Sequence, residues 1–218
     1  MGRDAGWLTG SAVFGGAEMS LIPEIPMTEE RQKKFYEKIK EKYYNSKTKS
    51  LIIAVSEGVR WFDKKTGKLD VVYASSEVDE YGHPRFGGIS GVIASEITAN
   101  LKLDARAQIT GYYARAGECR RYDKRLVEAL ADKVADILLR EKYGRMPVLS
   151  KIVHFQDLYE YNTKTIDMGN VGNFPLPLDY YDEENFHFNN KYIDFLSHII
   201  NKPNITKFEH NFPKVSPL

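Results

Sequence analysis

The 218-residue sequence contains one cysteine, Cys119, and its formal net charge is only +1. A single cysteine excludes an internal disulfide and a metal site built from several cysteines, and it is typical of a reducing compartment. The near-zero charge excludes a global field that would attract nucleic acid or an anionic membrane. No apolar run reaches the length of a membrane span or of a signal-peptide core. We therefore expect a cytoplasmic protein that binds neither nucleic acid nor membrane.

Several common catalytic motifs are also absent. The sequence has no glycine-rich loop ending in Lys-Ser or Lys-Thr, no HExxH helix and no paired CxxC. The stretch Gly88 to Gly91 lacks the spacing of a hydrolase nucleophile elbow. His83 has no second histidine at a spacing that would share a metal ion. We therefore expect no metal site in this chain, and its chemistry must come from other side chains.

Patterns typical of helices and strands alternate along the chain. Apolar periodicity predicts helices at residues 4–14, 28–44, 90–101, 122–142 and 191–200, and strands at 19–22, 51–55, 106–110 and 148–158. Asp4 and Thr28 are candidate N-caps of the first two helices. The alternation is typical of an α/β layer fold with a mainly parallel sheet flanked by helices.

The clearest helical pattern predicts one apolar stripe on residues 122–142. Its members are spaced three or four residues apart. They are Leu126, Ala129, Leu130, Val134, Ile137 and Leu138. Residues 60–69 form a mostly polar stretch, and Thr66-Gly67 within it is typical of a turn.

Two short segments are candidates for ligand binding. Gly2 and Arg3 precede a predicted helix start, where backbone N–H groups and a guanidinium can hold an anion. The alternative is a solvated arginine. Glu57 follows the predicted strand at 51–55, and ligands collect at the carboxyl ends of strands in α/β sheets. Its carboxylate could accept hydrogen bonds from sugar hydroxyls, or it could cap a turn.

Arginines gather in and around the stretch GYYARAGECRRYDKR. Guanidinium groups suit two-pronged recognition of phosphate, although some of these arginines could pair with neighbouring acidic residues instead. The cluster consists of Arg106, Arg115, Arg120, Arg121 and Arg125. The upstream GHPRFGG loop could cradle a phosphate, but we favour a structural turn that needs glycine at positive φ.

In combination and in order, five segments resemble the 6-phosphofructokinase family. They are MGRDAGWLTG, IPEIP, LIIAVSEG, GHPRFGG and RAQITGYYARAGECRRYDKRLVEALADKVADILL. The resemblance is clear from residue 1 to about 144 and looser beyond. It implies a phosphofructokinase-like α/β fold. Residues 1–145 would form the sugar-phosphate-binding domain, and residues 146–218 would add a strand, a helix and a tail that pack back on it.

The resemblance also implies roles at the start of the chain. Met1, Gly2 and Arg3 would contact fructose 6-phosphate. Arg3 would in addition be catalytic, since it would stabilise charge on the transferring phosphoryl group. Glu57 would hold sugar hydroxyls.

Three further residues would bind the 6-phosphate, again by resemblance. Arg106 would reach the site of a neighbouring subunit in a homo-oligomer. Tyr112 and Arg115 would bind the 6-phosphate within the subunit.

The same resemblance favours pyrophosphate over ATP as the phosphoryl donor. Tyr112 stands where the ATP-dependent bacterial pattern has histidine, and Ala114 and Ala116 replace its glutamine and first glycine. The GHPRFGG segment is similar to one in the pyrophosphate-dependent branch. We therefore expect a phosphofructokinase of glycolysis that uses pyrophosphate. The alternatives are an ATP-dependent 6-phosphofructokinase and a catalytically silent sugar-phosphate-binding or oligomerisation module.

The donor half of the family pattern is absent from these 218 residues. There is no GGDGT-like loop for the donor phosphates and no TIDxD-like segment with the aspartate base. We expect that the N-terminal donor domain is missing, through truncation at an internal methionine. A naturally separate subunit is the alternative. Mg2+ would be bound mainly by the missing half with the donor phosphates. Without the aspartate base and the donor loop, this chain alone would be inactive. An apolar face left uncovered would favour association.

Overall fold

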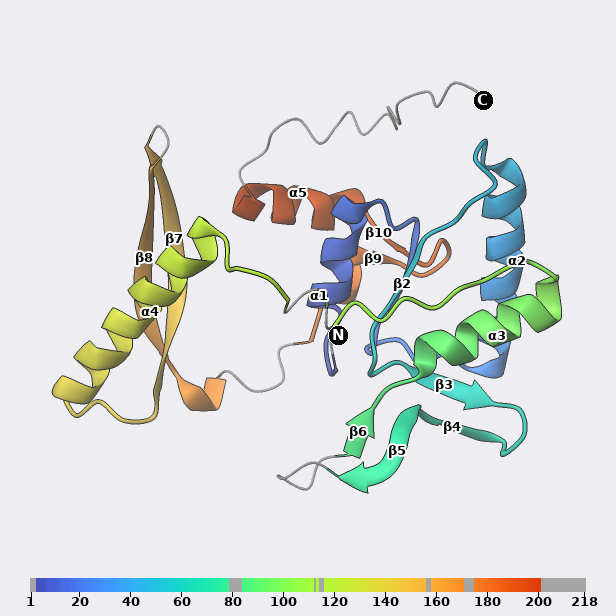
Figure 1. Cartoon of the computed structure of the whole chain (residues 1–218), viewed down its shortest axis with the longest axis horizontal. Coiled ribbons are helices and arrows are strands. Elements are labelled where there is room, and N and C mark those ends of the chain that lie inside the picture. Colours follow the sequence, from blue (N-terminus) through green and yellow to red (C-terminus); the bar gives the residue numbers. More distant parts are fainter. Residues whose placement is uncertain are drawn as a thin grey trace.

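The computed structural model describes residues 3–78, 84–111, 113, 116–155, 158–170 and 175–200 (Figure 1). Its helices are α1 Trp7–Gly10, α2 Glu29–Asn45, α3 Ile89–Leu101, α4 Arg121–Leu139 and α5 Asn190–Ile200, with 3₁₀ turns η1 Ser11–Gly15, η3 Met168–Asn170 and η4 Leu178–Tyr180. Its strands are β1 Met19–Leu21, β2 Ile53–Val55, β3 Arg60–Asp63, β4 Lys68–Val71, β5 Tyr73–Val78, β6 Pro84–Phe86, β7 Arg145–Phe155, β8 Leu158–Asp167, β9 Tyr181–Asp182 and β10 His187–Phe188.

The parallel pair β1–β2 lies at the centre of the fold. Met19 faces Ile53 and Leu21 faces Val55 across this pair. The other described ladders, β3–β4, β5–β6, β7–β8 and β9–β10, are antiparallel. The α/β class expected from the sequence is present, but in the described residues parallel pairing is limited to β1–β2 and an isolated bridge between Met27 and Trp61. Short connections explain the difference, because a turn such as the one at Gly67 (φ +68°) can join only antiparallel strands.

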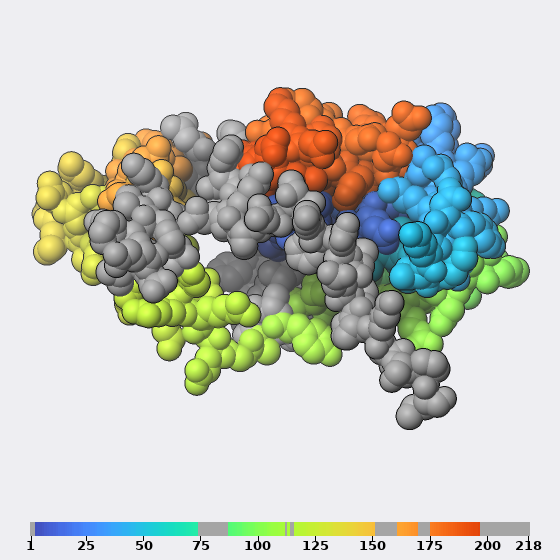
Figure 2. Space-filling view, turned by 90° about the horizontal axis from the view of Figure 1, so that it is seen from above, coloured from blue at the N-terminus to red at the C-terminus, as the bar shows by residue number. Residues whose placement is uncertain are grey.

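The C-terminal segment returns to β1. The Ser20 N–H donates to the carbonyl of Phe186 at 2.6 Å, just before β10, and the Tyr181 hydroxyl donates to the Ser20 carbonyl. In Figure 2 the orange and red C-terminal residues lie over the dark blue N-terminal ones. Residues from the two ends of the described chain therefore pack together, and Tyr192 of α5 is fully buried there.

Helix α2 follows from its local sequence. The Thr28 side chain accepts a hydrogen bond from the Arg31 N–H at 3.4 Å, which confirms Thr28 as the N-cap. Glu30 pairs with Lys34 at 2.8 Å one turn later. That lysine lowers the pKa of the Glu30 carboxyl through its hydrogen bond and its charge. The opposite face of the helix is apolar and buries Phe35.

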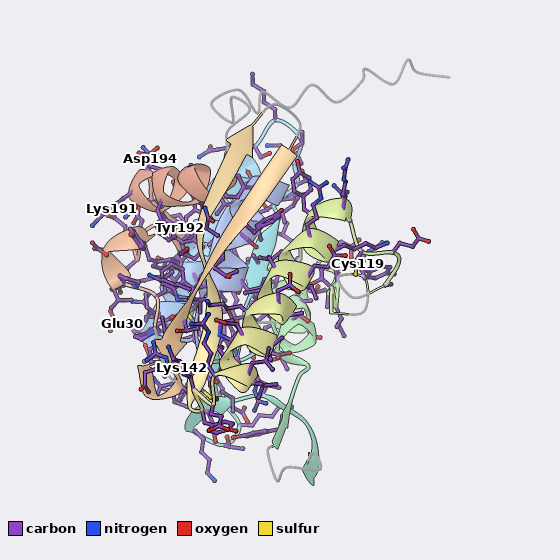
Figure 3. All side chains as sticks on the ribbon, turned by 90° about the vertical axis from the view of Figure 1, so that its left-hand side faces the viewer. Glu30, Cys119, Lys142, Lys191, Tyr192 and Asp194 are labelled. Carbon is purple, nitrogen blue, oxygen red and sulfur yellow. The ribbon has the colours of Figure 1, made fainter. Side chains whose placement is uncertain are left out.

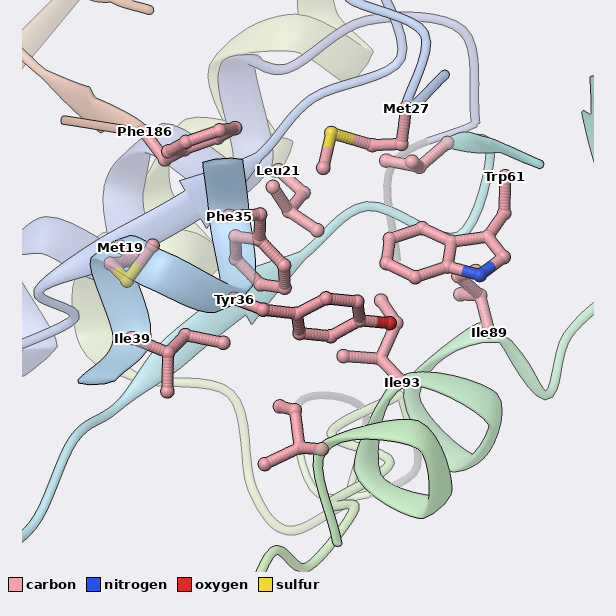
Figure 4. Close-up of a cluster of buried hydrophobic side chains, with 12 residues drawn as sticks. Met19, Leu21, Met27, Phe35, Tyr36, Ile39, Trp61, Ile89, Ile93 and Phe186 are labelled. Atoms are coloured by element: carbon pink, nitrogen blue, oxygen red, sulfur yellow. The ribbon is translucent and has the colours of Figure 1, made fainter. Parts of the chain in front are cut away.

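The main hydrophobic core lies between α2, α3, β1 and β3 (Figure 4). Phe35 meets Trp61 edge to face, with ring centroids 6.3 Å apart, and Ile93 of α3 is buried in the same cluster. A polar contact also reaches this core, since Glu96 accepts hydrogen bonds from the Tyr36 hydroxyl and from Trp61 Nε1. Burial and the Glu96 carboxylate raise the pKa of Tyr36, so its hydroxyl stays a donor.

Helix α4 packs on the β7–β8 hairpin, away from α2 and α3 (Figure 1). Ile137 is 7% exposed, whereas Val134 is 41% and Leu138 57% exposed. The predicted single stripe is therefore wrong for Val134 and Leu138, because the hairpin covers only one side of the helix. Together with Val127, at 62% exposure, these two side chains form an uncovered apolar strip.

Two other local expectations are wrong. Residues 4–14 contain the short helix α1 followed by η1, and α1 begins only at Trp7, so its N-cap is Gly6 rather than Asp4. The Gly6 N–H donates to Glu24 at 2.9 Å. Residues 106–110 form no strand. Their single large apolar side chain, Ile109, is 64% exposed, so burial does not hold this segment extended against a neighbour.

The remaining predicted elements are confirmed within a few residues. Residues 19–22 contain β1, 51–55 contain β2, 90–101 match α3, 122–142 match α4, 148–158 overlap β7, and 191–200 match α5. The division of the chain at residue 145 stays a prediction. In the part of the chain that the structure describes, no helix is long and apolar enough to cross a membrane.

Replacing Gly10 tests the packing of the two chain ends. A Cβ at Gly10 would lie 2.5 Å from Cζ of the buried Tyr192 ring. We expect Gly10→Ala to destabilise the fold by about 1–3 kcal/mol, the usual cost of overpacking. A Cβ at Gly15 meets nothing within 4 Å, so Gly15→Ala should be neutral or slightly stabilising. Thermal melting measures both, and equal melting temperatures would contradict this packing.

Two neighbouring residues of α4 test which side of the helix is covered. Ile137→Ala should cost about 2–4 kcal/mol, because it empties a buried site against the hairpin. Leu138→Ala should cost about 0.5 kcal/mol or less, because its side chain is more than half exposed. Urea denaturation gives both free energies. If Leu138→Ala is the more damaging change, the described orientation of α4 is wrong.

Candidate functional site

The candidate site begins at the carboxyl edge of the β1–β2 pair. Because the two strands are parallel, the residues that follow them emerge at the same edge. Glu24 comes three residues after the end of β1, and Ser56, Glu57 and Gly58 come directly after β2. Glu57, predicted from the sequence as a strand-end carboxylate, is half-buried there.

The N-terminal segment lies against this edge. A Cβ at Gly58 would overlap the carbonyl oxygen of Arg3 and lie 2.6 Å from its carbonyl carbon. Only glycine permits so close an approach of two backbones. The contact places the exposed residue Arg3 beside the residue that follows Glu57. Two of the predicted site segments, far apart in sequence, therefore meet.

Buried hydrogen bonds hold the two segments together. The hydroxyls of Thr9 in α1 and Ser56 after β2 share a hydrogen bond, and Ser56 is fully buried. The Ser56 N–H continues the strand pairing by donating to the Leu21 carbonyl at 3.0 Å. A buried polar pair is costly to break, because each hydroxyl would lose its partner away from water. This pair therefore fixes α1 over the end of β2.

An aromatic group from α5 supports α1 from the other side. The Tyr192 hydroxyl donates to the Trp7 carbonyl at 3.0 Å. Burial raises the pKa of Tyr192 to about 12, so the phenol keeps its proton near neutral pH. The Trp7 ring also lies 5.8 Å from the Phe195 ring, centroid to centroid. The short helix that follows Arg3 is therefore clamped between β2 and α5.

Arg106 lies on the irregular segment after α3. Its guanidinium pairs with Asp104 at 3.0 Å, and its side chain is 81% exposed. The ion pair of Arg106 therefore lies within its own chain segment. Its predicted reach to a neighbouring subunit stays a prediction.

Four predicted binding residues lie outside the residues that the structure describes. They are Met1, Gly2, Tyr112 and Arg115. Their roles stay predictions.

The glycine-rich segment before α3 fits the structural-turn interpretation at Gly88. This residue is the N-cap of α3, with φ +85° and ψ −11°, a conformation that favours glycine. His83, in the same segment, lies outside the described residues. The single cysteine, Cys119, is exposed in the loop before α4 (Figure 3).

Sequence reasoning missed three residues that build the site. Thr9 and Ser56 form the buried hydroxyl pair, and Glu24 binds two backbone N–H groups. The strand-end rule that selected Glu57 applies equally to Glu24, because both follow short apolar strands. No local pattern could have paired Thr9 with Ser56.

The arrangement has simple chemical consequences. The Glu57 carboxylate can accept hydrogen bonds from hydroxyl groups, and the Arg3 guanidinium can bind an anion with two parallel hydrogen bonds. Within the described residues, no three His, Cys, Asp or Glu side chains lie together so as to hold a metal ion. The side chains at this edge are thus of the kinds that bind hydroxyl groups and anions.

Comparison with known proteins gives these features a family. The phosphofructokinase family profile matches residues 1–138. The chain is 33% identical over 147 residues to the pyrophosphate–fructose 6-phosphate 1-phosphotransferase of Dictyoglomus thermophilum. This alignment covers 66% of this chain and 40% of that protein. The chain is also 30% identical over 150 residues to the ATP-dependent 6-phosphofructokinase of Mycobacterium tuberculosis, 68% of this chain and 41% of that protein.

The fold agrees with a solved structure. The pyrophosphate-dependent phosphofructokinase of Marinobacter aquaeolei aligns with a TM-score of 0.62 and 20% identity, over 90% of this chain and 45% of that one. The chain thus spans less than half the length of these proteins. The profile match over most of the chain shows that it belongs to the phosphofructokinase family.

Proposed function

We propose that residues 1–218 supply the fructose 6-phosphate side of a phosphofructokinase, which forms fructose 1,6-bisphosphate in glycolysis with pyrophosphate as the phosphoryl donor. The observation that carries the proposal is the contact of the Arg3 carbonyl with Gly58, next to Glu57. It brings the two segments expected to hold the sugar to one edge of the β1–β2 pair.

Each proposed role follows from side-chain chemistry. Glu57 accepts hydrogen bonds from sugar hydroxyls and so orients the ring. Arg115 and Tyr112 hold the 6-phosphate, since a guanidinium matches two phosphate oxygens and a phenol adds one donor. Arg3 stabilises negative charge that develops on the transferring phosphoryl group, where a fixed cation contributes more than water does.

The preference for pyrophosphate has two supports. Tyr112, Ala114 and Ala116 depart from the ATP-dependent pattern, and both the Dictyoglomus relative and the Marinobacter structure are pyrophosphate-dependent enzymes. An ATP-dependent enzyme at 30% identity is nearly as similar, so the donor rests chiefly on those departures. Arg106 belongs to the same proposal, as a group that reaches a second copy in a homo-oligomer.

Mg2+ enters this proposal with the donor phosphates. The residues that the structure describes contain no group of three His, Cys, Asp or Glu side chains that could hold a metal ion. The chain's own contribution is to bind and orient the sugar phosphate and to supply positive charge. In this proposal the proton-accepting aspartate and the loop that binds the donor phosphates belong to the part of the family pattern that these residues do not contain.

Titration of fructose 6-phosphate tests the proposed function. We expect the sugar phosphate to raise the melting temperature, because a ligand that binds only the folded state stabilises it. Arg115→Ala and Arg3→Ala should each weaken binding by about 10–100-fold, as expected for loss of a charged hydrogen bond. Arg140→Ala is the matched control, since this guanidinium pairs with Asp136 on α4. The absence of any shift with the wild-type chain would contradict the proposal.

A second test concerns catalysis. We expect residues 1–218 alone to show no phosphoryl transfer with pyrophosphate or ATP, in the presence of Mg2+. Loss of a general base alone costs about 10²–10⁴-fold, and the donor loop is absent as well. A coupled assay for fructose 1,6-bisphosphate measures the rate. Turnover above the uncatalysed background would show that this chain carries its own base and donor site.

A further inference from the structure

Glu24 occupies the same strand edge as Glu57 but has no role in the function proposed so far. It follows β1, as Glu57 follows β2, and the parallel pairing puts both at one edge. Its environment differs from that of an exposed acidic residue. The side chain is half-buried, and its Oε2 atom is buried with no hydrogen-bond partner in the described part of the chain.

The other oxygen of Glu24 joins two distant segments. Oε1 accepts the Gly6 N–H at 2.9 Å and the Leu176 N–H at 2.7 Å. Leu176 stands between Pro175 and Pro177, so its N–H is the only backbone donor of these three residues. A single carboxylate therefore ties the N-terminal segment and the C-terminal segment to the end of β1.

Gly6 fits tightly against this carboxylate. A Cβ at Gly6 would lie 3.1 Å from Glu24 Oε2 and 2.6 Å from Cγ2 of Ile22. The backbone at residue 6 thus has little freedom to shift along the edge. Arg3 is three residues away and makes its own close backbone contact with Gly58. The segment that carries Arg3 is therefore fixed at both contacts, one on each strand end.

We propose that Glu24 is a positioning residue for the sugar-phosphate site, which it serves by holding residues 3–6 so that Arg3 stays beside the Glu57 segment. The inference rests on the proposed function. Glu24 does not touch the ligand: it acts through the Gly6 N–H and the backbone that follows Arg3.

The negative charge of Glu24 matters to this role. A carboxylate that accepts backbone N–H groups forms charge-assisted hydrogen bonds, which are roughly twice as strong as neutral ones. A glutamine could still offer one oxygen to both donors, but through weaker bonds, and it would bury an amide N–H₂ where Oε2 now lies. Glutamine has nearly the same size and shape as glutamate, so this substitution should loosen the segment without leaving a cavity.

The test is a double-mutant cycle between Glu24 and Arg3, with fructose 6-phosphate affinity measured by calorimetry on the full 218-residue chain. Glu24→Gln should weaken binding by about tenfold in the wild-type background. In the Arg3→Ala background the same change should weaken binding less than twofold, because the group that Glu24 positions is already gone. A merely structural role would give the same loss in both backgrounds, and that result overturns the proposal.

Glu18 provides the matched control. Its carboxylate also accepts a backbone N–H, from Ile52 at 3.3 Å, but it lies before β1 and so at the opposite edge. Glu18→Gln should change the affinity less than twofold. A loss equal to that of Glu24→Gln would show a general loss of stability and would overturn the assignment.

The remaining outcomes separate this inference from the proposed function. No binding by the wild-type chain overturns both. Binding by wild type with equal losses in the two Arg3 backgrounds overturns the role of Glu24 alone. Circular dichroism checks that each variant folds. If Glu24→Gln does not fold, Glu24→Asp, which keeps the charge but shortens the side chain by one methylene, replaces it in the same cycle with the same criterion.

Discussion

The close approach of the Arg3 backbone to Gly58 is the constraint on which the rest of the candidate site depends. It exists because residue 58 has no Cβ, and it occurs where the parallel strands β1 and β2 both end. Without this approach, Arg3 would be an exposed arginine near the start of the chain. With it, the Arg3 backbone and the Glu57 segment lie together at one edge of the sheet, where α/β proteins bind their ligands.

The surrounding fold keeps that edge rigid. On one side, the buried Thr9–Ser56 hydroxyl pair fixes α1 to the end of β2. On the other side, Tyr192 packs against Gly10 and donates to the Trp7 carbonyl. The C-terminal segment thus closes over the N-terminal one (Figure 2). Tyr192 is fully buried against α1 and bonds to Trp7, 185 positions away, so the order of the first residues depends in part on the C-terminal segment.

Helix α4 and the β7–β8 hairpin illustrate a different property. The helix is apolar on two sides, and the hairpin covers only one of them, so Val127, Val134 and Leu138 remain exposed. An exposed strip of this kind is unusual on a protein that needs no further packing.

Local patterns predicted most of the elements, because capping and periodicity act within a few residues. Thr28 caps α2, the apolar runs form β1 and β2, and α3, α4 and α5 lie near their expected positions. Two expectations failed where the outcome depends on more than the local pattern. The helix α1 begins at Trp7, so Gly6 rather than Asp4 is its N-cap, and residues 106–110 form no strand, with Ile109 exposed.

The sequence by itself determined the family, the α/β class and the identity of Arg3 and Glu57 as candidates, since ordered motifs and strand-end positions are properties of the chain alone. Only the tertiary structure decided that Arg3 meets Gly58, that Thr9 pairs with Ser56, and that Glu24 joins Gly6 to Leu176. The reason is physical. These contacts join residues between 18 and 152 positions apart, and such contacts form only when strand pairing and core packing have brought the segments together.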